Sequence, residues 1–76
     1  MTTCNQILDA RGLSCPLPIL RTRNALNGMN SGENLEVLAT DPGAMKDMDA
    51  FCKQTGNSLM SVREEGTDQI FVIRKM

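Results

Sequence analysis

Three cysteines and no histidine define the chemistry open to this 76-residue chain. Histidine is the usual general base near neutral pH and the commonest metal ligand, so its absence argues against proteases, esterases and metal hydrolases. The cysteines, Cys4, Cys15 and Cys52, include no C-x-x-C pair, and their odd number does not suit a disulfide framework. We therefore expect free thiols in a reducing compartment, with no metal and no organic cofactor.

Cys15 lies in the most distinctive segment of the chain, Cys15-Pro16-Leu17-Pro18. Proline breaks a helix interior but is tolerated in the first turn, where the N–H groups have no intrahelical acceptor. Pro16 therefore marks the start of a helix and puts Cys15 at or beside the N-cap. Cysteine is a poor capping residue, which favours another role for it. The alternative, a buried structural cysteine, is common among free cysteines but fits an exposed helix end poorly.

A helix N-terminus favours an anion, and a thiolate is the anion that Cys15 could provide. We therefore expect the pKa of Cys15 to be lowered, although the prolines remove some of the N–H donors. Gly12 permits the tight approach of the chain to this turn, and Pro16 and Pro18 fix the backbone after it. Together these residues predict an accessible, nucleophilic sulfur at one end of a sheet.

The rest of the chain supplies the elements that must position this sulfur. Apolar periodicity and the placement of glycine and proline predict six of them. They are a strand over 6–10, a helix from Pro16 to Gly28, a strand over 35–40, a helix from Asp41-Pro42 to Gly56, and strands over 58–64 and 69–74. This order predicts an α/β (α+β) two-layer sandwich, βαβαββ, with two helices on a four-stranded mixed sheet. We expect one domain over 1–76, with a mobile N-terminus over 1–5.

The first helix has an apolar face and a candidate docking surface. One face carries the residues at helical spacing, Ile19, Thr22, Leu26 and Met29. Leu17 and Leu20 then point away from the sheet beside Arg21, within a turn of Cys15, and could contact a partner protein. Alternatively, the two leucines lie against a loop, such as the one before Cys15.

The second helix is expected to begin at Asp41, as its cap, with Pro42 in the first helical position. Its apolar face is predicted to comprise Met45, Met48, Phe51, Cys52 and Thr55. Cys52 and both methionines are then core residues rather than ligands. Asp41, at the end of a strand, could also come near Cys15, which would add it to the docking surface.

Charge, aromatic content and apolar runs limit the classes of partner and the compartments that we expect for this chain. The formal charge is -1, and two Phe are the only aromatic residues, which disfavours direct binding of nucleic acid. The longest apolar runs are far shorter than a membrane span, and the first residues lack the pattern of a signal peptide. We expect a cytoplasmic monomer. Arg11, Arg21 and Arg23 could stabilise a thiolate or could be ordinary surface charges, and Cys4 could form adventitious disulfides between molecules.

The segment around Cys15 resembles the SirA/TusA family of small sulfur-carrier proteins. The matching residues run in order along nearly the whole chain: Leu8-Asp9, Gly12-Leu13, Cys15-Pro16-x-Pro18, Gly32-Glu33, Asp41-Pro42, Asp47 and Ile73-Arg74-Lys75. The C-P-x-P box alone is a weak motif, but the full set is specific. Cys4 falls outside the family pattern.

The resemblance implies a βαβαββ fold and a sulfurtransferase that carries sulfur as a persulfide on Cys15. It also implies a donor, such as a cysteine desulfurase or a rhodanese, and an acceptor protein. Known destinations in the family are tRNA uridine thiolation, molybdenum cofactor metabolism and sulfur oxidation. Two alternatives stay open. One is a non-catalytic binding or redox-regulatory module of the same fold, and the other is an RNA-binding sandwich, which the net charge disfavours.

Overall fold

The computed structural model describes residues 5–76. Its elements follow the predicted order and are β1 (Gln6–Ala10), α1 (Leu17–Asn27), β2 (Asn34–Ala39), α2 (Ala44–Thr55), β3 (Ser58–Glu65) and β4 (Asp68–Arg74). The predicted βαβαββ sandwich is therefore confirmed. Cys4 and the rest of 1–4 lie outside the described residues, whereas the backbone N–H of Asn5 already donates to the carbonyl of Asn34 at 2.9 Å. No helix within 5–76 is long and apolar enough to cross a membrane.

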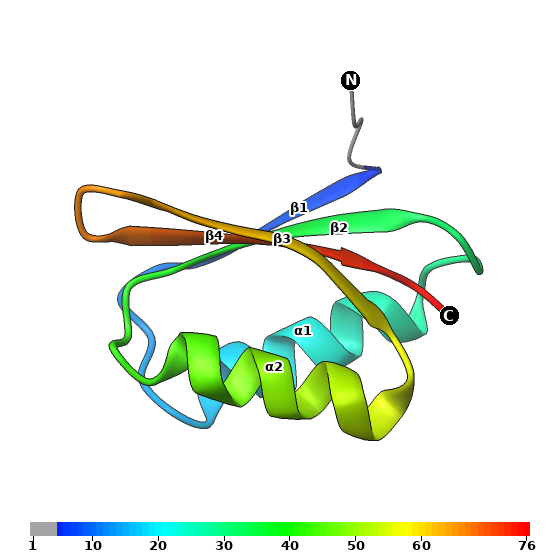
Figure 1. Cartoon of the computed structure of the whole chain (residues 1–76), viewed down its shortest axis with the longest axis horizontal. Helices are drawn as coiled ribbons and strands as arrows, with labels where there is room; N and C mark the ends of the chain where they lie inside the picture. Colours follow the sequence, from blue (N-terminus) through cyan, green and yellow to red (C-terminus); the bar gives the residue numbers. More distant parts are fainter. Residues whose placement is uncertain (1–4) are drawn as a thin grey trace.

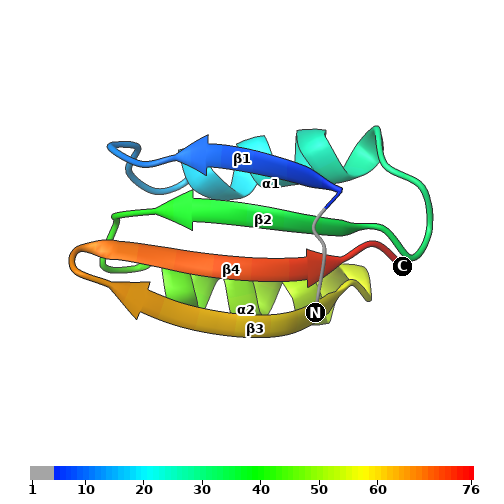
Figure 2. The same cartoon turned by 90° about the horizontal axis from the view of Figure 1, so that it is seen from above.

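The four strands form one mixed sheet in the order β1-β2-β4-β3. β1 is parallel to β2, and β4 is antiparallel to both of its neighbours, β2 and β3. The strands on either side of β4 therefore run in the same direction. Both helices pack on one face of this sheet (Figure 1), and Figure 2 shows the opposite face. The result is two layers, one of strands and one of helices.

The core lies between the two layers and is built from alternate strand residues and one face of each helix. The largest fully buried side chains are Phe71, Leu26, Leu35, Met48, Ile73, Val37 and Thr22. Thr22 is the polar member, and its hydroxyl donates to the carbonyl of Pro18 at 2.8 Å, which satisfies it inside the core. Thr22, Leu26 and Met29 are buried and Ile19 packs against the core, so the predicted inner face of α1 is confirmed.

The start of the second helix differs from the sequence expectation. The helix begins at Ala44 with Gly43 as N-cap, and no side chain caps it. Asp41 instead uses its backbone, because its carbonyl accepts the N–H of Ala44 at 3.0 Å. Asp41 and Pro42 thus form the turn before the helix, and the prediction of a capping Asp41 and a helical Pro42 is wrong.

The inner face of α2 is confirmed except at Met45. Met48, Phe51 and Cys52 are buried, whereas Met45 is 41% exposed. Met45 lies in the first turn and at the edge of the apolar face, next to an open groove between α2 and the β3–β4 turn. The prediction of Met45 as a core residue is therefore wrong. The helix ends as predicted at Gly56, whose left-handed conformation (φ 82°) glycine adopts without strain.

Candidate functional site

The loops that follow β1 and β2 meet at one end of the molecule. Because β1 and β2 are parallel, their carboxyl ends lie at the same edge of the sheet, and both helices begin beneath that edge (Figures 1 and 2). The loop from β1 to α1 carries Cys15. The loop from β2 to α2 carries Asp41, and the first turn of α2 carries Asp47. Topology therefore brings one thiol and two carboxyl groups to the same corner.

Gly12 shapes the loop before the cysteine. Its backbone has φ 79°, in the left-handed region that glycine adopts without a β-carbon clash. In this conformation the N–H of Gly12 donates to Thr40 Oγ1 at 2.9 Å, which ties the β1–α1 loop to the end of β2. Gly12 thus has the turn-forming role predicted for it, and the tie fixes one side of the loop that carries Cys15.

The thiol of Cys15 is exposed and lies directly before α1. The N-cap is Pro16, as the two prolines predict, and the Cys15–Pro16 peptide bond is cis. The start of the helix has few N–H groups to offer the sulfur. Leu17 donates its N–H to the carbonyl of Ser14 at 2.9 Å, and Pro18 has none. The local backbone therefore presents the sulfur without stabilising it as a thiolate.

The acidic corner raises the pKa of Cys15 above the usual value of a thiol. The Asp47 carboxylate contributes most to this rise in pKa, followed by desolvation and then by the charge of Asp41. Each of these favours the neutral thiol over the thiolate. The sequence-based expectation of a lowered pKa is therefore wrong, because carboxylates from a distant part of the chain act on Cys15.

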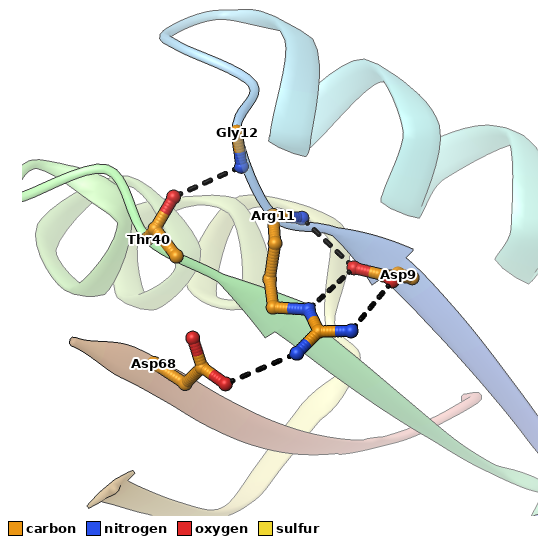
Figure 3. A network of polar contacts seen from close by, with 5 residues as sticks. All are labelled: Asp9, Arg11, Gly12, Thr40 and Asp68. Carbon is orange, nitrogen blue, oxygen red and sulfur yellow. Dashed lines mark hydrogen bonds and ion pairs between the residues drawn. The ribbon is translucent and has the colours of Figure 1, made fainter. Parts of the chain in front are cut away.

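Arg11 is the cationic residue nearest to Cys15 in the sequence, but its guanidinium is paired with the carboxylates of Asp9 and Asp68. Figure 3 shows it reaching across β2 between Asp9 and Asp68. Its Nη2 lies 2.9 Å from Asp9 Oδ2, and its Nη1 lies 3.3 Å from Asp68 Oδ2. These contacts raise the pKa of Arg11 and lower that of Asp9 to about 2. Arg11 therefore joins β1 to β4, which does not support a role in stabilising a thiolate on Cys15.

The candidate docking residues of α1 are accessible. Leu17 is 42% exposed and Leu20 is 43% exposed, and Arg21 is exposed as well. The leucines therefore point away from the core, as their helical positions predict. Asp41 is half-buried, and its carbonyl accepts a hydrogen bond from Gln69 Nε2 at 2.7 Å. Whether these residues contact a partner stays a prediction.

A groove of about 450 Å³ opens on another side of the start of α2. Its lining includes Thr40, Pro42, Met45, Glu64, Asp68 and Gln69, and Cys15 does not contribute to it. Within residues 5–76 no cluster of side chains has the composition of a metal site. The sulfur of Cys15 is thus presented on the surface rather than inside a pocket, which suits contact with another protein.

Comparison with known proteins assigns the fold and the motif to one family. Residues 6–75 match the family of the sulfurtransferase TusA. The chain belongs to the TusA family. The sulfur carrier protein TusA of Allochromatium vinosum is 59% identical over 75 residues, which cover 99% of each chain. The sulfur carrier protein TusA of Pseudomonas putida is 37% identical over 73 residues, covering 96% of this chain and 91% of that one.

A solved structure supports the same fold. A SirA-like protein from Desulfitobacterium hafniense superposes with a TM-score of 0.75 over 91% of this chain and 93% of its own. At 23% identity this likeness shows the architecture alone. The resemblance inferred from the C-P-x-P box and the other matching residues is therefore confirmed at the level of the TusA family and its fold.

Sequence reasoning missed one residue at the site, Asp47. It appeared among the residues that carry the family resemblance, but no position near Cys15 was predicted for it. A signal was available, because two helices that follow parallel strands begin at the same sheet edge. An acidic residue in the first turn of the second helix can therefore approach the loop before the first.

Proposed function

We propose that this TusA-family chain is a sulfur carrier that accepts sulfane sulfur as a persulfide on Cys15 and delivers it to another protein. The single observation that supports this most strongly is an exposed thiol at the C-P-x-P start of α1 in a chain of this family. The relatives from Allochromatium vinosum and Pseudomonas putida are both named sulfur carrier proteins. In this sense the chain acts as a sulfurtransferase whose carrier is its own cysteine side chain.

The transfer resembles thiol–disulfide exchange and needs no histidine. Cys15 loses its proton to solvent, and the thiolate attacks the outer sulfur of a persulfide on the donor. A new S–S bond forms on Cys15 while the donor S–S bond breaks, and the donor cysteine leaves as a thiolate that takes up a proton. Delivery repeats the same step, with the acceptor thiolate as the nucleophile. No net oxidation occurs, so no redox cofactor is required beyond the covalently carried sulfur.

A carrier needs one surface for its donor and acceptor. Leu17, Leu20 and Arg21 lie in the first two turns of α1, directly after Cys15, and the charge of Asp41 acts on Cys15 from the β2–α2 loop. We assign the contact with a donor protein, such as a cysteine desulfurase or a rhodanese, to this surface. Two exposed leucines offer apolar area beside the sulfur, and the flanking charges can fix orientation. Persulfide chemistry at a free thiol suits a reducing compartment, so we propose that the chain acts in the cytoplasm.

Loading can be followed on one peptide. Trypsin cleavage at arginine and lysine separates the three cysteines, with Cys15 alone in the peptide 12–21. After incubation with a cysteine desulfurase and cysteine, we expect this peptide to gain about 32 Da, the mass of one sulfur atom. Cys15→Ser should gain nothing, whereas Cys52→Ala, which alters a buried thiol, should load like the natural chain. Loading at Cys52, or none at Cys15 with either a desulfurase or a rhodanese, would exclude the proposal.

A further inference from the structure

We propose that Thr40 is a positioning residue for Cys15, because its hydroxyl holds the turn that sets the direction of the sulfur-bearing loop. This inference rests on the proposed role of Cys15 as the sulfur site. Thr40 directly follows β2, whereas Cys15 lies in the loop between β1 and α1. The two residues are joined through Gly12, whose backbone N–H donates to Thr40 Oγ1 at 2.9 Å.

The loop between β1 and α1 consists of two consecutive turns. The first turn is closed by the N–H of Leu13, which donates to the carbonyl of Ala10 at 3.3 Å. The second turn, which contains Cys15, is closed by the N–H of Leu17, which donates to the carbonyl of Ser14 at 2.9 Å. Because the second turn follows directly on the first, the orientation of the first turn decides where the sulfur lies relative to the sheet.

Thr40 extends the contact between β1 and β2 beyond the end of their paired segment. The parallel pairing ends where Ala10 lies opposite Ala39. One residue after Ala39, the side chain of Thr40 accepts the N–H of Gly12 in place of a backbone carbonyl. Threonine is branched at its β-carbon and has few side-chain rotamers, so its hydroxyl oxygen is held in position at little cost in entropy.

The hydrogen bond to Thr40 fixes the first turn at Gly12. Within the described chain, no atom outside the neighbouring residues lies within 4 Å of the point that a β-carbon on Gly12 would occupy, so side-chain packing does not hold the turn on this side. Leu13 packs against the core and keeps the loop close to the sheet. Loss of the Thr40 hydroxyl should therefore loosen the orientation of the turn and leave the fold intact.

Arg11, in the same turn, makes a second contact with another strand (Figure 3). Its Nη1 lies 3.3 Å from Asp68 Oδ2 at the start of β4. Ion pairs on the surface contribute little and are screened by salt, whereas a hydrogen bond between neutral groups is not screened in this way. We therefore assign the orientation of the loop to Thr40 rather than to the ion pair, and we expect the effect of Thr40 to persist at high salt.

Sulfur transfer between two proteins requires the attacking sulfur to lie in line with the S–S bond that breaks. A misplacement of about 1 Å can reduce the rate of such a step by about a hundredfold. A turn that changes its orientation reduces the fraction of docked complexes in which Cys15 is aligned. Thr40 therefore acts on the rate of transfer inside the complex and not on the affinity for the donor, whose proposed contacts lie mainly on α1.

The test measures the rate at which a cysteine desulfurase loads Cys15 as a function of carrier concentration, read by mass spectrometry on the peptide 12–21. Thr40→Val replaces the hydroxyl by a methyl group of similar size. We expect its maximal loading rate to fall about tenfold, with an unchanged half-saturating concentration. Thr40→Ser, which keeps the hydroxyl, should restore most of the rate.

Thr55→Val is the matched control, because it makes the same substitution at a hydroxyl that donates to the carbonyl of Phe51 at 2.8 Å, near the far end of α2. This variant should load at the rate of the natural chain. Equal maximal rates for Thr40→Val and Thr40→Ser, or equal losses in Thr40→Val and Thr55→Val, would overturn the inference. If Thr40→Val does not fold, Thr40→Ala is judged by the same criterion.

A second readout separates this inference from the proposed function. Backbone order parameters from NMR relaxation of the amide groups report the motion of Ser14 and Cys15 without any sulfur donor. They should fall in Thr40→Val and recover in Thr40→Ser, and unchanged values in Thr40→Val would overturn the role of Thr40. Absence of loading in the natural chain would exclude the proposed function, while the order parameters would still decide whether Thr40 holds the loop.

Discussion

Cys15 and Cys52 carry the same thiol group in two different settings. Cys52 is 4% exposed on the inner face of α2, and its pKa is raised first by burial and then by the charge of Asp49. Cys15 is exposed at the start of α1, and its pKa is raised mainly by Asp47. Of these two cysteines, only Cys15 can meet a sulfur atom on another protein without unfolding. Exposure, rather than a low pKa, distinguishes the candidate carrier residue.

The contact between Asp9 and Arg11 predicts that the stability of the fold depends on pH. Arg11 donates to Asp9 from its side chain and from its backbone, which lowers the pKa of Asp9 to about 2. A carboxyl group whose pKa is lower in the folded chain than in the unfolded chain stabilises the fold at a pH above its unfolded pKa of about 3.9. This contribution disappears as the pH falls through the pKa of the folded chain. We expect Asp9→Asn to lower the urea midpoint at pH 7.

The difference in urea midpoint between Asp9→Asn and the natural chain should narrow between about pH 4 and about pH 2. The effect is small in absolute terms, because the ion pair is on the surface and is screened by solvent. A difference that stays constant over this range would show that the carboxylate charge of Asp9 is not what stabilises the end of β1.

Helix α1 has a buried face and an exposed face. Its inner face buries Thr22 and Leu26 against the sheet, and its outer face exposes Leu17 and Leu20 beside the sulfur. Replacing Leu17 or Leu20 by Glu should leave the fold intact, because both side chains are more than two-fifths exposed. It should weaken the binding of a donor desulfurase by about tenfold or more, which corresponds to about 1.4 kcal/mol for burial of a charge in an apolar contact.

A matched control for the leucines is Met60→Glu, which places the same charge on a 47% exposed apolar residue of β3. Affinities can be measured by titration calorimetry and the fold by circular dichroism. Unchanged affinity for Leu17→Glu and Leu20→Glu, or equal weakening by Met60→Glu, would contradict the assignment of the docking surface to α1.

Local sequence patterns were enough to predict the start and the inner face of helix α1. The prolines at 16 and 18 placed the start of α1, and apolar spacing placed Thr22 and Leu26 on its inner face. The start of α2 was harder, because Asp41 is a good capping residue whose backbone, rather than side chain, meets the helix. The exposure of Met45 could not be read from spacing, since it depends on how far the β3–β4 turn extends over the first turn of α2.

The pKa of Cys15 depends on the tertiary structure, because charged groups from another loop act on its thiol. Sequence reasoning considered a single helix end and predicted a lowered pKa for Cys15. The folded chain adds Asp47 and Asp41 from another loop, and their effect has the opposite sign. Sequence could place Cys15 at the exposed start of α1, because the C-P-x-P context is local. Sequence could not predict its protonation, because the groups that set it are distant along the chain.

Residues 5–76 form a small two-layer sandwich, and the thiol of Cys15 is exposed at one corner of it. Within residues 5–76 that sulfur lies outside the groove beside α2. Under the proposed function, this chain contributes the cysteine and a contact surface, and the donor or acceptor protein contributes the remaining chemistry.

The central claim is that sulfur on Cys15 moves onward to another protein, and a chase experiment tests it most directly. The protein is loaded by a desulfurase, freed from it, and mixed with a rhodanese whose active-site cysteine is empty. We predict that the peptide 12–21 loses about 32 Da while the rhodanese cysteine gains the same mass. Sulfur that stays on Cys15, or leaves as free sulfide without reaching the second protein, would contradict the account and favour a redox-regulatory role for this thiol.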